Sequence, residues 1–210
     1  MVKVKGFRRK KTKLKTKNTE KTRRLVMIAI LSALIIVLQI ISNFIRFGPV
    51  QITLALTPII IGAAMYGMWA GAFLGAVLGG VIVVWGLLGL DGGFVLALMG
   101  INPFMTIAVC ILKTTVAGFV AGVVFKAIAK KNDVVASFVA GGLCPIVNTG
   151  IFLAAMLTIF VDFVKGLADG KNVIVFAIST FVGINFLVEF IVNMVLATAV
   201  TRIIRAFKKS

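Results

Sequence analysis

The sequence predicts an all-α polytopic membrane protein, a compact bundle of six transmembrane helices with both termini in the cytoplasm. Of its 210 residues, 60% are hydrophobic, and the mean hydropathy of +1.13 lies far above the soluble globular range. The apolar residues gather into six runs, and about 20 such residues cross the hydrocarbon layer as a helix. Because the runs do not alternate apolar and polar residues, they favour helices over the strands of a membrane barrel.

A strongly basic segment precedes the first apolar run. It carries twelve of the 23 cationic residues. We interpret residues 1–22 as a basic cytoplasmic tail that sets topology and attracts anionic lipid headgroups. Nucleic-acid binding is the weaker interpretation, because an apolar span follows directly. No small-x-small cleavage site follows that span, so we expect an uncleaved first helix. Residues 23–206 then form one six-helix membrane domain, and residues 207–210 a basic end.

The first three helices are expected at residues 23–45, 52–65 and 70–90. The first begins at an arginine pair and ends before the polar residues 46–51. Pro58 lies within the second and is expected to kink or restart it. Residues 66–69 then form a tight turn with interfacial aromatics. The third helix ends where Asp91 and two glycines open a longer loop.

The last three helices are expected at residues 104–128, 134–161 and 173–204. Pro103 precedes the fourth, and a polar turn at residues 130–133 separates it from the fifth. Residues 162–172 form the next loop, and basic residues follow the sixth helix. Cys110 and Cys144 both lie inside apolar runs, where packing is a better account than a disulfide or a metal site.

The distribution of cations predicts the orientation. With a cytoplasmic N-terminus, the tail, three residues near position 130 and four at the C-terminus place nineteen cations inside. Only Arg46, Lys165 and Lys171 then lie outside, and Lys113 lies within a span. This imbalance favours a cytoplasmic position for both termini, which requires an even number of spans.

Glycines recur every four residues along the third helix. Gly67, Gly71, Gly75 and Gly79 share one helical face, and Gly118 and Gly122 repeat the spacing in the fourth helix. Such faces allow a neighbouring backbone to approach closely. The pattern therefore predicts tight internal packing more than it predicts a functional site.

Few polar side chains lie inside the predicted spans, where they are costly unless paired or facing a cavity. They are Gln39, Asn43, Lys113, Asn148, Asn185, Glu189 and Asn193. At 1.5 Å per residue, Lys113, Asn148 and Asn185 lie about 16, 21 and 20 Å from the outer helix ends. We expect these three to line a ligand cavity among the last three helices. The alternative is a structural pair between Lys113 and Glu189, with the asparagines bonded between helices.

The outer loops carry a second group of candidates. Arg46 lies between the first two helices, and Asp91 and Asn102 bracket the loop after the third. These loops are candidates to close over a ligand, with Gly92 and Gly93 as hinges. Ordinary loop solvation is the competing explanation.

Several catalytic and energy-coupling motifs are missing. The sequence has no phosphate-binding G-x-x-x-x-G-K-[ST] loop, no H-E-x-x-H motif and no histidine. We therefore expect no enzyme activity, no cofactor and no resident metal, and we expect any ATP hydrolysis to occur on separate subunits. A stand-alone facilitator or small channel remains open, and an intramembrane enzyme using a serine without a histidine base is the least favoured class.

Several segments in order resemble the substrate-binding S components of energy-coupling factor (ECF) transporters, the prokaryotic vitamin importers. Residues 24–33 (RLVMIAILSA) are similar to the family's first helix, where Ala29 and Ala33 match its A-x-x-x-A motif. Residues 54–63 (LALTPIIIGA) resemble its second helix, and residues 117–122 (AGFVAG) the end of its fourth. Tyr66-Gly67 with Gly71 and Gly75 resembles the turn into its third helix.

The resemblance implies a passive vitamin binder in the prokaryotic plasma membrane. Ala29 and Ala33 would dock on a membrane coupling subunit, EcfT-like, which carries two ATPase subunits. The vitamin would bind near the outer face, among the outer loops and helices four to six, and toppling of the subunit would release it inside. Lys113, Arg46 and the asparagines suit a carboxylate-bearing, amide-rich vitamin such as pantothenate, and riboflavin or another vitamin remains open.

Overall fold

The protein is an elongated helical bundle in a computed structural model. It describes the backbone of residues 2–42, 46–47, 50–51 and 53–209, and the side chains of residues 19–42, 53–183, 186–199 and 202. The elements, in chain order, are α1 (Val2–Ser42), β1 (Arg46–Phe47), β2 (Val50–Gln51), α2 (Leu56–Tyr66), α3 (Met68–Leu87), α4 (Phe94–Ile101), α5 (Pro103–Ala129), α6 (Asp133–Thr158), α7 (Val161–Ala168), α8 (Val173–Ala177), the π-helical turn η1 (Ile178–Val182) and α9 (Gly183–Lys209).

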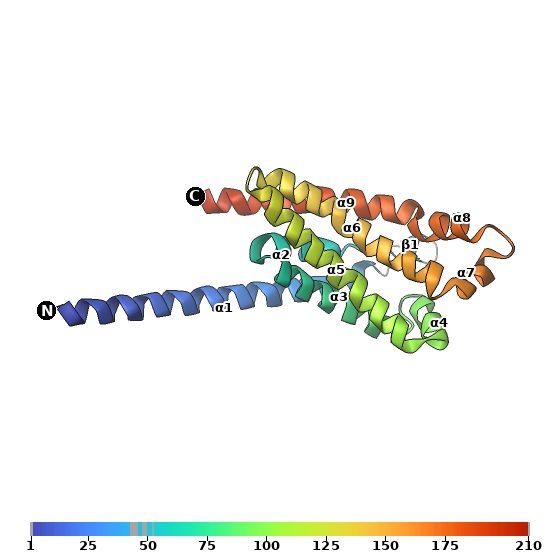
Figure 1. Ribbon diagram of the computed structural model, residues 1–210, viewed down its shortest axis with the longest axis horizontal. Coiled ribbons are helices and arrows are strands. Elements are labelled where there is room, and N and C mark those ends of the chain that lie inside the picture. The colour runs from blue at the N-terminus through green and yellow to red at the C-terminus, as the bar shows by residue number, and fades with distance from the viewer. Residues whose placement is uncertain (1, 43–45, 48–49, 52, 210) are drawn as a thin grey trace.

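The long helices run along a common direction and the short ones gather at one end (Figure 1). Both ends of the chain lie at the same end of the bundle, together with the turn between α5 and α6. Helices α4 and α7 lie at the opposite end. The bundle therefore has a basic end, which carries the termini, and a second end covered by short helices.

The described residues form five helices long and apolar enough to cross a membrane, namely Thr19–Ser42, Met68–Leu87, Pro103–Ala129, Asp133–Thr158 and Val173–Ala199. The prediction of six is not confirmed. The expected second helix is reduced to α2, which has 11 residues and a length of about 16 Å. That is roughly half of the hydrocarbon thickness.

Helix α2 begins at Leu56 and not near residue 52 as predicted, because the backbone before it is bonded to side chains of other helices. The backbone N–H groups of Thr53 and Leu54 bond to the side chains of Glu189 and Ser42, at 3.3 Å each, instead of to helical carbonyls. Non-helical backbone is tolerated at membrane depth only when it is buried in protein or lines a cavity. Pro58 then occupies the first turn of α2, where its missing N–H leaves no helical bond unmade. It restarts the helix and does not kink it.

Three further boundaries differ from the sequence prediction. Helix α1 begins at Val2, because the basic segment is rich in lysine and arginine, which favour the helix. The loops predicted to lie outside contain the short helices α4 and α7. The sixth predicted helix is divided into α8, η1 and α9, with Gly183 at φ 19° and ψ −142° at the junction.

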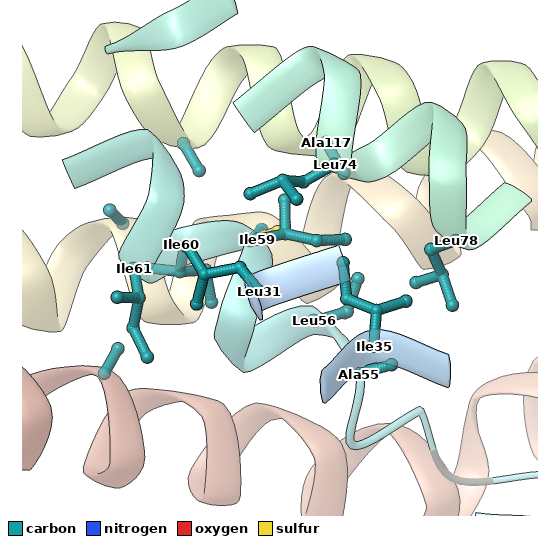
Figure 2. Packing of buried hydrophobic residues seen from close by; sticks show 14 residues of the cluster. Leu31, Ile35, Ala55, Leu56, Ile59, Ile60, Ile61, Leu74, Leu78 and Ala117 are labelled. Carbon is teal, nitrogen blue, oxygen red and sulfur yellow. The ribbon is translucent and has the colours of Figure 1, made fainter. Parts of the chain in front are cut away.

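The main core lies where α1, α2 and α3 meet (Figure 2). Leu31 and Ile35 of α1 and Leu56 and Ile59 of α2 are almost fully buried there, beside Leu74 of α3. Lipid tails are as apolar as these side chains, so burial against lipid supplies little driving force. Close van der Waals packing therefore accounts for most of the stability of this contact.

The glycine face of α3 packs directly on the backbone of α5, as predicted. A side chain at Gly71 would collide with the backbone of Gly118, and one at Gly118 would collide with the backbone of Gly71. Gly75 and Gly79 meet α5 in the same way. Gly67 differs, because it forms the turn between α2 and α3 at φ 89° and has open space around it.

Candidate ligand-binding site

A cavity of about 90 Å³ lies among α1, α3, α4, α5, α6 and α9. A single buried water requires roughly 10–15 Å³, so this space admits several waters or a small organic molecule. Its lining includes residues of α4 and Phe160, which immediately precedes α7, and these two helices lie at the end of the bundle opposite the termini (Figure 1). The cavity walls carry two groups of side chains, an aromatic layer of phenylalanines and a polar layer of buried hydrogen-bonding residues.

The aromatic layer is built around Phe94 of α4. The centroid of its ring lies 6.1 Å from that of Phe152, 6.0 Å from that of Phe163 and 5.9 Å from that of Phe181. Phe152 and Phe181 are also in contact, with centroids 5.7 Å apart and planes at 84°. These aromatic pairs, of which all but the tilted Phe94–Phe152 pair are edge-to-face, are each worth about 0.5–1.5 kcal/mol beyond the area they bury. They hold α4 against α6, α7 and η1 over the cavity.

The polar layer is formed by Asn148 of α6, Glu189 of α9 and Trp85 of α3. Asn148 and Glu189 are each only 5% exposed. Asn148 Oδ1, Glu189 Oε1 and Trp85 Nε1 are buried and make no hydrogen bond within the described part of the protein. A buried polar group without a partner costs about 1–3 kcal/mol, so three such atoms around one cavity indicate a site built to be filled.

Lys113 of α5 lines the same cavity and is half-buried. Its Nζ lies 4.8 Å from the centroid of the Phe152 ring, a favourable cation–π geometry. The alternative pairing with Glu189 is not formed as a salt bridge. Across the described residues, the salt bridge that is present joins Lys165 and Asp162 on α7.

Glu189 is held in place by its neighbours. Its Oε2 accepts a hydrogen bond from Thr53 N at 3.3 Å, and its carbonyl oxygen accepts one from Asn193 Nδ2 at 2.8 Å. Asn193 Oδ1 in turn accepts a hydrogen bond from Thr57 Oγ1 at 2.8 Å. This chain of bonds joins α9 to the start of α2 and leaves Glu189 Oε1 facing the cavity.

The outer-loop candidates have local structural partners. The Asp91 carboxylate accepts hydrogen bonds from Gly93 N at 3.0 Å and Val95 N at 2.7 Å, which fixes the start of α4. Asp91 also lines the cavity. Asn102 caps α5 by accepting a hydrogen bond from Met105 N at 3.1 Å, and it is not among the described residues that line the cavity.

The side chains of Arg46 and Asn185 lie outside the described residues. Ala29 and Ala33 are exposed on α1, on the side of the helix away from the buried Leu31 and Ile35. The structure therefore brings together Lys113, Asn148 and Asp91 from the predicted site. It leaves Ala29 and Ala33 on an open face.

Sequence reasoning missed the aromatic residues of the site, Trp85 and the phenylalanines. Phenylalanine is common in every apolar run of this chain, so its presence alone gave no signal. One usable pattern was the spacing of four that places Asn148, Phe152 and Met156 on one face of α6, since residues one helical turn apart share a face. All three line the cavity.

Comparison with known proteins identifies a family for this chain. A family described as ECF transporter, substrate-specific component, matches residues 23–204. A search of curated proteins gave no match. The match covers the helical bundle and every described residue of the cavity. The chain therefore belongs to the family of substrate-specific components of ECF transporters.

Proposed function

We propose that this multi-pass membrane protein binds a vitamin in the cavity beneath α4 and delivers it to an ATP-driven importer. The observation that carries the proposal is the group of three buried polar atoms without partners around one cavity. Family membership supports a substrate-specific transport subunit over an enzyme. The partners would be a membrane coupling subunit and two ATPase subunits, in a prokaryotic plasma membrane with both termini cytoplasmic.

Lys113 and Asn148 are the first ligand contacts of this proposal. Lys113 offers a cation to a carboxylate or carbonyl oxygen, and Asn148 Oδ1 offers an acceptor to a hydroxyl or amine. Asn185, one turn before Glu189 on α9, and Arg46 are proposed to approach from the last helix and the first outer loop. Asp91 and Asn102 would act by holding α4 and the start of α5 over the ligand.

Two kinds of vitamin suit different parts of the cavity. A carboxylate-bearing vitamin such as pantothenate suits the cation of Lys113. A ring-bearing vitamin such as riboflavin suits the walls formed by Phe94, Phe152 and Phe181, because aromatic faces pack favourably on one another.

The exposed face of α1 is the proposed docking surface for the coupling subunit. Ala29 and Ala33 are small, exposed and one turn apart, so a partner helix can approach their backbone closely. Docking there would connect this chain to ATPase subunits. The chain's own sequence has no phosphate-binding loop for ATP.

The proposal is tested by purifying the protein in detergent and identifying any co-purifying small molecule by mass spectrometry. A vitamin panel in a thermal-shift assay is the second arm, because a ligand that binds only the folded state raises its stability. We expect one vitamin to be recovered or to raise the melting temperature. Failure of both arms would contradict the proposal.

The alternative of a stand-alone facilitator is not favoured by the family match. Purified protein in liposomes distinguishes the two. A facilitator equilibrates a labelled vitamin without ATPase subunits, whereas the proposed subunit binds the vitamin and requires its partners for uptake.

A further inference from the structure

We propose that the occupant of the cavity is an amino-substituted aromatic heterocycle. Its donors would meet Asn148 Oδ1 and Glu189 Oε1, and its ring would lie against the phenylalanines of the aromatic layer. This inference rests on the function proposed above and narrows the substrate class.

The unpartnered atoms specify the hydrogen-bonding edge of the ligand. The free Asn148 and Glu189 oxygens are acceptors, and Trp85 Nε1 is a donor. A complementary ligand therefore presents two N–H or O–H donors and one acceptor. On the ligand, an amino group next to a ring nitrogen or a carbonyl places such donors and an acceptor within a few ångströms of one another.

Both acceptors are positioned before a ligand arrives. Glu189 Oε2 is already bonded to Thr53 N at 3.3 Å, so the carboxylate is oriented with Oε1 toward the cavity. Asn148 lies on α6 one turn from Phe152, whose ring contacts both Phe94 and Phe181. A pre-oriented acceptor loses little entropy on binding, which favours ligands that match it.

The aromatic layer favours a ligand whose main part is a planar ring. Phe94, Phe152 and Phe181 contact one another in pairs, with centroid distances between 5.7 and 6.1 Å. They form a wall of rings that lines the same cavity as the polar atoms. A planar ring gains stacking and edge-to-face contacts there that a flexible aliphatic chain does not make.

Calorimetric titration of the purified full-length protein tests the inference. The probes are pterin, lumazine, riboflavin and pantothenate. Pterin and lumazine form a matched pair, because lumazine carries a carbonyl where pterin carries its amino group. We expect pterin to bind most tightly, and lumazine to bind about tenfold or more weakly, since it places an acceptor against an acceptor.

Variants assign the effect to the two acceptors. Asn148→Leu and Glu189→Gln are expected to weaken pterin binding about tenfold or more. Gly118→Val is the control, because it strains the contact with the Gly71 backbone at a residue that does not line the cavity and does not contact Glu189. It should lower the melting temperature and leave the affinity unchanged. Size-exclusion profiles identify any variant that does not fold, and Asn148→Ala, which also lacks the acceptor, then replaces Asn148→Leu.

The outcomes separate this inference from the proposed function. Tightest binding of pantothenate, or pterin binding unchanged in both acceptor variants, overturns the inference while the vitamin-binding function stands. Equal binding of pterin and lumazine also overturns it. If no probe binds and no small molecule co-purifies, both the inference and the proposed function fail.

Discussion

At the residue scale, Lys113 illustrates how a membrane protein keeps a charge inside the bilayer. The ammonium lies over the Phe152 ring and lines the cavity, although an intramembrane lysine usually needs a partner or a water-filled space. Because the alternative, a salt bridge with Glu189, is not formed in the described structure, both groups remain available to a ligand.

Replacing Lys113 with Met is expected to weaken ligand binding about tenfold or more, since a charge-assisted hydrogen bond is worth about 1.5–3 kcal/mol. The melting temperature of the ligand-free protein should change little, because the loss of the cation–π contact with Phe152 is offset by removal of a charge from the bilayer interior. Titration and thermal unfolding measure the two effects. Unchanged affinity with a lower melting temperature would show that Lys113 has a structural role.

At the element scale, the contact between α3 and α5 depends on glycine. Replacing Gly118 with Val places a side chain against the backbone of Gly71, and overpacking of this kind costs about 1–3 kcal/mol. Gly80→Val is the control, because Gly80 lies on the same helix pair with open space around it. We expect the melting temperature in detergent to fall for Gly118→Val and to stay close to the wild-type value for Gly80→Val.

The elements also show what could be predicted from sequence. The long helices α3, α5 and α6 begin and end within a few residues of their predicted positions, because apolar length and turn residues are local signals. The short α2 was not predictable in this way. Its start depends on Glu189, more than a hundred residues away in the sequence, which bonds to Thr53.

The candidate site was predictable only in its polar part. Lys113 and Asn148 stood out because polar residues are rare in apolar runs, and they do line one cavity. Trp85 and Phe94 gave no such signal, since aromatic residues are ordinary in membrane helices. Their place in the site depends on how α3 and α4 pack, which is a property of the tertiary structure.

At the scale of the whole molecule, both ends of the chain lie at the same end of the bundle (Figure 1). Single cysteines introduced at Asn18 and at Lys171, in a background with Cys110→Ala and Cys144→Ala, test the orientation. Asn18→Cys is expected to react with an impermeant thiol reagent only in inverted vesicles, and Lys171→Cys in whole cells. The reverse pattern would place the termini outside.

The coupling of transport to ATP hydrolysis also belongs to the scale of the whole molecule, because it would require a partner subunit docked on α1. Ala29→Trp with Ala33→Trp is expected to abolish vitamin uptake in cells, because two indoles prevent close approach of a coupling subunit to α1. Vitamin binding by the isolated protein should survive. Leu187→Trp, at an exposed position on α9, is the control and should retain uptake. Normal uptake by the alanine variant would exclude this face as the docking surface.

The central claim is that the cavity among α3, α5, α6 and α9 holds a vitamin, and mass spectrometry of the native protein tests it most directly. The purified protein should carry one vitamin at close to one molecule per chain. That mass should be lost in Glu189→Gln and kept in Gly118→Val, since Gly118 does not line the cavity. A protein that carries no small molecule after expression in vitamin-replete cells, and binds none on addition, would contradict the claim.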